Sequence, residues 1–188
     1  MKKGKKMKVY TFLADGFETV EALCVVDILR RAKIDVTTVS IKNSKEVVSA
    51  HNITVIADAI FDEVDFSDGD ALFLPGGLKG TINLEAHEGL KSLILEYYKD
   101  DKYLIAICAA PSILGHLGLL EGKKATCYPG FEPDLKGAVY KGDGVVEDGK
   151  IITARGMGKT IDLGLKLLKI FEGNETAIKM GNTIQYLV

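Results

Sequence analysis

The stretch YLIAICAAP, residues 103–111, is the part of the sequence that decides the fold. The apolar residues at its start indicate a buried strand. Cys108 and two alanines follow, and then Pro111, which suits a first helical turn because proline has no N–H group to leave unsatisfied there. The stretch therefore predicts a strand that passes directly into a helix, with a cysteine at the joint.

Short apolar or β-branched runs alternate with helical patterns on both sides of this stretch. Strands are predicted at residues 8–13, 35–41, 47–48, 53–56, 71–74, 103–107 and 124–127 and within the Gly- and Asp-rich region 139–153, and helices at residues 18–32, 86–99, 110–117 and 160–171. This order predicts an α/β fold, with a mostly parallel sheet and helices on both of its faces.

The composition is that of a soluble globular domain, with 188 residues of which 47% are hydrophobic and 27% charged. The formal net charge is -2, and beyond the N-terminus the two signs of charge are interspersed. A nucleic-acid or membrane surface would need clustered basic residues. We therefore expect neither nucleic acid nor membrane as a partner.

Lysines crowd the N-terminus, but the apolar run that follows them is too short for a secretory signal. We predict a disordered basic tail at residues 1–6 and one α/β domain over residues 7–188, located in the cytoplasm. The cysteines, Cys24, Cys108 and Cys127, should then stay reduced and act as thiols.

Ligands of a parallel sheet bind at the carboxyl ends of its strands. Unusual residues follow three of the predicted strands, at residues 15–21, 75–77 and 108–111. Cys108 is the most informative of them. It resembles the nucleophile of a strand-to-helix elbow, where small neighbours are required and the positive end of the helix lowers the thiol pKa. The alternative is a buried cysteine that acts as a small hydrophobic residue.

The other two strand ends also allow two interpretations. Gly76 and Gly77 form either a simple turn or a close backbone approach that offers N–H groups to a developing oxyanion, with the Ala109 N–H as a second donor. Glu18 and Glu21 stand three residues apart at a predicted helix start. They are either solvated carboxylates, or one of them turns inward and takes part in catalysis.

Five segments together resemble one family along nearly the whole chain. They are DGFETVEAL (15–23), VDILRRAKIDVT (26–37), LFLPGG (72–77), AICAAPSIL (106–114) and TARGMGKTIDLGL (153–165). In order and spacing they resemble the ThiJ/PfpI superfamily and, within it, the branch of the parkinsonism-associated protein deglycase. The resemblance implies a flavodoxin-like three-layer sandwich that forms a homodimer.

The resemblance also implies roles for residues of this chain. Cys108 matches the reactive cysteine of the family, and Glu21 matches the acidic residue whose protonated carboxyl group hydrogen-bonds the thiolate. Glu18 matches a second glutamate at the mouth of the pocket. Gly76 and Gly77 match the glycines behind the oxyanion site.

The sequence departs from the family pattern at two positions, and these differences limit which subfamily it can belong to. Peptidase-like members carry a histidine directly after the reactive cysteine, where this chain has Ala109, so we do not expect a peptidase. Several deglycase-branch members have a histidine where this chain has Tyr128, whose hydroxyl is a poor proton shuttle near neutral pH. The resemblance also places Arg155 in a loop near the pocket and the dimer surface. His51 falls where relatives carry a basic residue that approaches the partner subunit's pocket.

No His, Cys or Asp cluster has metal-ligand spacing, and no nucleotide-binding glycine motif occurs. We predict no metal and no cofactor. The resemblance implies an enzyme that acts on reactive dicarbonyls, either as a glyoxalase that converts methylglyoxal to lactate without glutathione or as a deglycase of glyoxal adducts. The alternative is a redox-sensing stress protein or chaperone that uses oxidation of Cys108, with little turnover.

Overall fold

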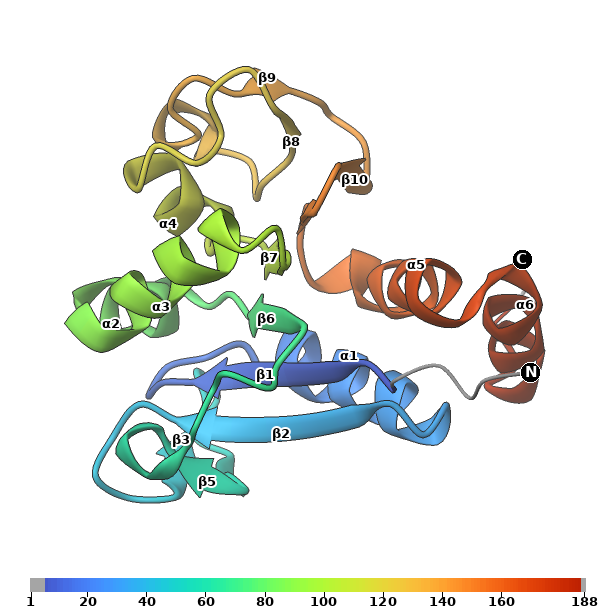
Figure 1. Ribbon diagram of the computed structural model, residues 1–188, viewed down its shortest axis with the longest axis horizontal. Helices are drawn as coiled ribbons and strands as arrows, with labels where there is room; N and C mark the ends of the chain where they lie inside the picture. Colours follow the sequence, from blue (N-terminus) through green and yellow to red (C-terminus); the bar gives the residue numbers. More distant parts are fainter. Residues whose placement is uncertain (1–5, 187–188) are drawn as a thin grey trace.

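The centre of the protein is a seven-stranded sheet with the order β10-β11-β7-β6-β1-β2-β5, seen in a computed structural model that describes residues 6–186 (Figure 1). Its strands are β1 (Lys8–Leu13), β2 (Asp35–Ser40), β5 (Ala59–Ile60), β6 (Ala71–Leu74), β7 (Tyr103–Ile107), β10 (Val145–Asp148) and β11 (Ile151–Ala154). Every neighbouring pair is parallel except β10 with β11. The predicted mostly parallel sheet is confirmed.

Two layers of helices cover the sheet and form a three-layer sandwich. One layer holds α2 (Leu78–Ala86), α3 (Glu88–Lys99) and α4 (Pro111–His116), and the other holds α1 (Thr19–Arg31), α5 (Thr160–Glu172) and α6 (Asn174–Thr183). Figure 1 shows α2, α3 and α4 grouped on one side and α5 and α6 on the other. The flavodoxin-like architecture predicted from the sequence is therefore confirmed.

Strand β7 shows why two hydrophobic cores form. Leu104 and Ala106 belong to the core beneath α3, whereas Ile105 and Ile107 belong to the core beneath α1 and α5. Successive side chains of a strand point to opposite faces, so a strand with apolar residues at every position feeds both cores at once. The continuous apolar run at residues 103–107 therefore places β7 in the middle of the sheet.

Two small sheets lie outside the central one. Strands β3 (Glu46–Val48) and β4 (Thr54–Ile56) form an antiparallel hairpin, as expected around the turn at His51. Strands β8 (Lys124–Ala125) and β9 (Val139–Tyr140) pair in parallel. Three short 3-10 helices complete the described chain: η1 (Phe61–Glu63), η2 (Glu132–Asp134) and η3 (Met157–Lys159).

Several element predictions were wrong or incomplete. The edge strand β5 and the 3-10 helix η1 directly after it were not predicted. Helix α2 begins directly after Gly77 and was not predicted, and α6 was missed because its sequence is mostly polar. The predicted basic tail, except for Lys6, lies outside the described residues.

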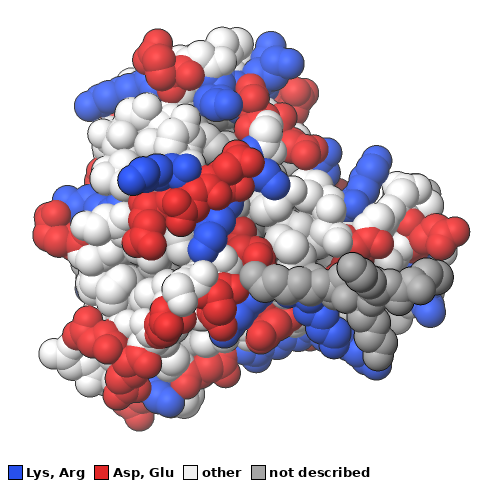
Figure 2. All heavy atoms as spheres, viewed as in Figure 1, with Lys and Arg blue, Asp and Glu red and all other residues white. Residues whose placement is uncertain are grey.

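The surface carries mixed charge on the face that Figure 2 shows, where acidic and basic side chains are interspersed. Within residues 6–186, no helix combines the length and the apolar character needed to cross a bilayer.

Candidate active site

Cys108 is held in a strained backbone conformation between β7 and α4. Its φ is +66°, in the left-handed region that non-glycine residues rarely adopt and that costs on the order of 1–3 kcal/mol. Its N–H donates to the carbonyl of Ala154 at 2.9 Å, and its carbonyl accepts from the N–H of Tyr128 at 2.8 Å. The end of β11 and the loop after β8 thus fix the cysteine in this conformation, which fits the predicted elbow.

Glu21 lies beside this cysteine, in the first turn of α1. It is only 1% exposed, so the interpretation of a solvated carboxylate is wrong. One carboxyl oxygen, Oε2, accepts the Gly76 N–H at 3.0 Å, and the carboxyl group also hydrogen-bonds the Cys108 thiol and the Met157 N–H. The inward-turning alternative is therefore the one that the fold adopts.

Gly76 makes this close approach of thiol and carboxyl group feasible. A Cβ atom on this residue would lie 2.4 Å from Oε2 of Glu21 and 2.5 Å from Cβ of Cys108. Both distances are far shorter than a van der Waals contact. Any other amino acid at this position would therefore push the two groups apart.

The backbone amides around the sulfur differ in part from the prediction. The N–H groups of Gly77 and Ala109 hydrogen-bond the Cys108 sulfur. The N–H of Gly76, which we expected to face an oxyanion, is instead bonded to Glu21. Gly77 has a φ of +92°, and it has no room for a side chain because a Cβ atom would lie 2.4 Å from the carbonyl oxygen of Gly16.

The pKa of Glu21 is raised from 4.5 to about 7, mainly by burial and to a smaller extent by the negative charge of Glu18. Hydrogen bonds from Cys108, Gly76 and Met157 act in the opposite direction but do not outweigh the loss of hydration. Near neutral pH this carboxyl group is therefore close to half protonated.

Burial also raises the pKa of Cys108, to about 12, and the negative charge of Glu21 adds to the rise. The N–H groups of Gly77 and Ala109 lower the pKa, but by less. The expectation that the helix start gives a net lowering is wrong, because α4 is one short helix and the thiol is desolvated beside a carboxylate. Near neutral pH the thiol therefore keeps its proton, and the carboxyl group beside it is the group that gains or loses one.

Glu18 and His51 lie at the edge of this site. Nε2 of His51 is 3.6 Å from Oε2 of Glu18, and the imidazole is 72% exposed. The hairpin of β3 and β4 thus brings the histidine to the predicted mouth of the site within one chain. Its expected approach to a partner subunit stays a prediction.

Tyr128 and Arg155 come from the segments that follow β8 and β11. The Tyr128 ring lies against Gly156, and a Cβ atom there would be 3.3 Å from the ring and 3.9 Å from Oε1 of Glu21. Arg155 is exposed, and its Nη1 donates to the carbonyl of Gly142 at 3.3 Å. The Tyr128 ring therefore lies near Glu21, whereas the Arg155 side chain is bonded to the loop at Gly142, and neither side chain is among the groups that shift the pKa of the Cys108 thiol.

The remaining cysteines lie in other surroundings. Cys127 is fully buried, and burial raises the pKa of its thiol to about 12. Cys24 packs against the core beneath α1 and is partly exposed. In the part of the chain that the structure describes, no three His, Cys, Asp or Glu side chains are grouped as metal ligands.

The sequence analysis missed Gly156 and Met157 as members of this site. Both follow β11, which pairs in parallel with β7, and so they lie at the same edge of the sheet as Cys108. The rule that ligands bind at strand carboxyl ends applies equally to this strand. The predicted β region ends at residue 153, one residue before the end of β11, but the residues after it were not considered as part of the site.

Comparison with known proteins gives a consistent set of relatives. Residues 7–170 match the DJ-1/PfpI family. Protein DJ-1 homolog B of Arabidopsis thaliana is 37% identical over 179 residues, which cover 94% of this chain and 41% of the plant protein. A deglycase of Thermococcus kodakarensis is 34% identical over 154 residues, covering 81% of this chain and 92% of that protein.

Among solved structures, that of oxidized Toxoplasma gondii DJ-1 matches with a TM-score of 0.93 and 29% identity, over 97% of this chain and 100% of that chain. The chain spans less than half the length of the two Arabidopsis homologues, 41% and 45%. The family match and these relatives extend over most of the chain and include the segments that carry the site. This chain therefore belongs to the DJ-1/PfpI family.

Proposed function

We propose that this protein is a cofactor-independent cysteine enzyme that acts on reactive dicarbonyls. The observation that carries the proposal is the buried pair of Cys108 and Glu21, in direct hydrogen bond and beside two backbone N–H groups that face the sulfur. Such a pair supplies a nucleophile, a base and oxyanion donors within one small site. The deglycase of Thermococcus kodakarensis among the relatives supports the same chemistry.

In the first step, the proton of the thiol moves to the Glu21 carboxylate as the sulfur of Cys108 attacks the aldehyde carbon of methylglyoxal. The carbonyl oxygen takes up that proton, and a hemithioacetal forms. Moving the proton within the pair leaves its net charge unchanged, so the buried site does not have to hold a second negative charge. The N–H groups of Gly77 and Ala109 stabilise the oxyanion before it is protonated.

In the second step, the carboxylate of Glu21 removes the hydrogen from the former aldehyde carbon as a proton and returns a proton to the neighbouring ketone carbon. The hydroxyl proton of the hemithioacetal passes to the ketone oxygen. The aldehyde carbon is oxidised to a thioester while the ketone is reduced to an alcohol, so no external oxidant is required. Water then cleaves the thioester, which releases lactate and restores the thiol of Cys108. Removal of a glyoxal adduct from an amine or thiol would begin with the same attack.

Redox sensing is a second candidate function, and a specific observation favours it. The N–H groups of Gly77 and Ala109 and the carboxyl group of Glu21 surround the sulfur with hydrogen-bonding groups. A sulfinate at Cys108 would accept hydrogen bonds from all three, which would stabilise the oxidised form relative to the thiol. Peroxide treatment should then add two oxygen atoms at this residue first, and mass spectrometry would detect the added mass.

The deciding experiment measures lactate formed from methylglyoxal without glutathione. We expect turnover by the wild type and none by Cys108→Ser. Glu21→Gln should lose on the order of 10²–10⁴-fold in kcat, the usual contribution of a general acid and base. Cys127→Ser is the matched control, since this thiol belongs to the core on the opposite face of the sheet from the core that Cys108 packs against, and it should retain activity. If the folded wild type shows no turnover but peroxide oxidises it at Cys108, the enzymatic proposal is wrong and redox sensing is the supported function.

A further inference from the structure

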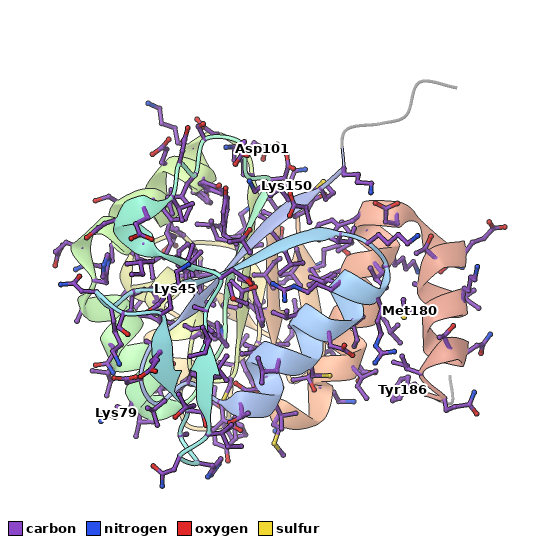
Figure 3. The ribbon with its side chains drawn as sticks, turned by 90° about the horizontal axis from the view of Figure 1, so that it is seen from below. Lys45, Lys79, Asp101, Lys150, Met180 and Tyr186 are labelled. Carbon is purple, nitrogen blue, oxygen red and sulfur yellow. The ribbon has the colours of Figure 1, made fainter. Side chains whose placement is uncertain are left out.

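A second concave site lies at the opposite end of the sheet from Cys108. It is a pocket of about 290 Å³ at the amino ends of β7 and β11, lined by residues 101–102 and 150–151 among others. Figure 3 shows Asp101 and Lys150 side by side at this end of the molecule, far from Lys79, which follows Gly77 of the active site. The pocket is therefore separate from the candidate active site.

The pocket gathers lysines from three distant parts of the chain. Lys99 and Lys102 come from the end of α3 and the turn that leads into β7, Lys123 precedes β8, and Lys150 precedes β11. These segments meet because β7 and β11 are parallel neighbours that start at the same edge of the sheet. We name this set the lysine pocket.

Two aspartates also line the lysine pocket, but they do not neutralise it. The Asp148 carboxylate already accepts the backbone N–H of Lys124 at 2.8 Å and lies 3.8 Å from Nζ of Lys123. Asp101 is the other acidic residue of the lining. Four lysines against two aspartates leave a surplus of positive charge, on a chain whose formal net charge is -2.

Among residues 6–186, no carboxylate forms a salt bridge with the ammonium group of Lys102 or of Lys150. Nζ of Lys150 lies over the Tyr103 ring at 4.0 Å from its centroid, and Nζ of Lys102 lies over the Tyr97 ring at 4.4 Å. The latter also donates to the carbonyl of Ser67 at 3.2 Å. Aromatic faces and a carbonyl orient an ammonium group but do not cancel its charge. Tyr97 and Tyr103 belong to the cores on opposite faces of the sheet, so the flexible side chains of Lys102 and Lys150 would turn toward the pocket to meet one anion.

We propose that the lysine pocket binds a small phosphate-bearing anion, either inorganic phosphate or a sugar phosphate, between Lys99, Lys102 and Lys150. Several compact ammonium donors around one cavity match a divalent oxyanion better than a single carboxylate. The volume lies at the small end of ligand sites, which run from about 300 to 1,000 Å³. The ring of Tyr98, 43% exposed, forms one wall against which the carbon skeleton of a sugar would pack.

This binding requires no chemistry at Cys108, so it stands or fails independently of the proposed function. The test is titration of ¹⁵N-labelled full-length protein with sodium phosphate and with ribose 5-phosphate, at an ionic strength held constant with sodium chloride. We expect saturable amide shifts concentrated at residues 99–103, 123–124 and 148–151, with a dissociation constant in the millimolar range or tighter.

Paired lysine variants make the result specific. The double variant Lys99→Gln with Lys150→Gln should weaken phosphate binding by about tenfold or more, which is about 1.4 kcal/mol. Lys79→Gln, which removes the same charge at the other end of the molecule, should leave the dissociation constant unchanged. The spectrum of each variant reports that it remains folded.

Tyr98→Ala separates the two sources of phosphate. Tighter binding of ribose 5-phosphate than of inorganic phosphate, with the difference lost in this variant, would support a sugar phosphate as the ligand. Equal affinities would support inorganic phosphate. Shifts that do not saturate, that appear at other residues, or that weaken as much in Lys79→Gln as in the double variant would overturn the proposal.

Discussion

Gly76 sets how closely the thiol of Cys108 and the carboxyl group of Glu21 approach each other. We predict that Gly76→Ala destabilises the fold by roughly 1–3 kcal/mol, the usual penalty for overpacking, and abolishes dicarbonyl turnover. The added methyl group would collide with both side chains, at 2.4 Å and 2.5 Å. Thermal unfolding and the lactate assay would measure the two effects.

Gly158→Ala is the control for that substitution. A Cβ atom at Gly158 meets no other atom within 4 Å, and its φ is not in the left-handed region. The control should therefore keep both stability and turnover. Wild-type behaviour of Gly76→Ala would mean that the two side chains do not approach as closely as the structure has them.

The raised pKa of Glu21 makes a prediction about the pH dependence of stability. The folded state holds this proton up to about pH 7, whereas the unfolded chain releases it near 4.5. The resulting stabilisation is fully present below 4.5 and is lost as the pH rises through 7, and it amounts to roughly 3 kcal/mol because one pKa unit is about 1.36 kcal/mol.

Glu21→Gln removes this dependence, since the amide does not titrate. Between about pH 4 and about pH 8, the free energy of unfolding of the wild type should fall by roughly 3 kcal/mol relative to the variant. Urea denaturation at both pH values measures the difference, and all other titrating groups cancel in the comparison. Parallel curves for the two proteins would show that the carboxyl group titrates normally.

At the scale of single residues, the sequence could predict where the reactive groups lie but not how they ionise. Cys108 follows from the strand-to-helix joint, and the inward turn of Glu21 follows from the family resemblance. The direction of the Cys108 pKa does not follow, because it depends on burial and on a carboxylate 87 positions away in the chain. The start of α4, which is visible in the sequence, influences the pKa of Cys108 less than burial and the Glu21 carboxylate do.

At the scale of elements, the hairpin of β3 and β4 carries His51 to the mouth of the candidate site. Asp15 holds the hairpin in place, since its Oδ1 accepts the Val48 N–H at 2.9 Å and Nζ of Lys42 at 2.9 Å. The N–H of Gly16 adds a bond to the carbonyl of Val48 at 2.7 Å. The loop after β1 thus positions both Glu18 and the hairpin.

We predict that Asp15→Ala loosens the hairpin and destabilises the protein by roughly 2 kcal/mol, because an N–H group and an ammonium group lose their shared acceptor. Hydrogen exchange at Val48 and Ala50 should accelerate. Asp15→Asn keeps one acceptor oxygen and should recover part of the protection. Asp62→Ala, at an exposed carboxylate, is the control, and equal exchange in the two alanine variants would contradict this role of Asp15.

Helices and strands with a clear hydrophobic pattern were predicted well, and those without such a pattern were missed. The bounds of β1, β6 and β7 agree with the prediction to the residue because each is a short, almost wholly apolar run. Helix α2 opens with LKG after two glycines, and this local pattern indicates a turn. Its helical form depends on packing over Phe17 and Gly16, which is not visible in the sequence.

At the scale of the whole molecule, the two cores leave apolar side chains exposed on both layers. Val20 on α1 and Leu95 on α3 are each 44% exposed, on opposite sides of the sheet. The homodimer expected from the family resemblance stays a prediction. We predict that its interface lies on the layer of α1, which carries both Val20 and Glu21. An interface there would also cover part of the mouth of the candidate site.

We therefore predict that light scattering at micromolar concentration gives about twice the chain mass of 20.4 kDa, since most soluble oligomers are twofold dimers. Val20→Glu should shift the protein toward the monomer, because a carboxylate would be desolvated in the interface twice, once from each subunit. Leu95→Glu introduces the same charge at equal exposure on the other layer and should leave the mass unchanged. A dimer that survives the first variant and dissociates in the second would place the interface on the α3 layer, and His51 would then have no partner subunit to approach.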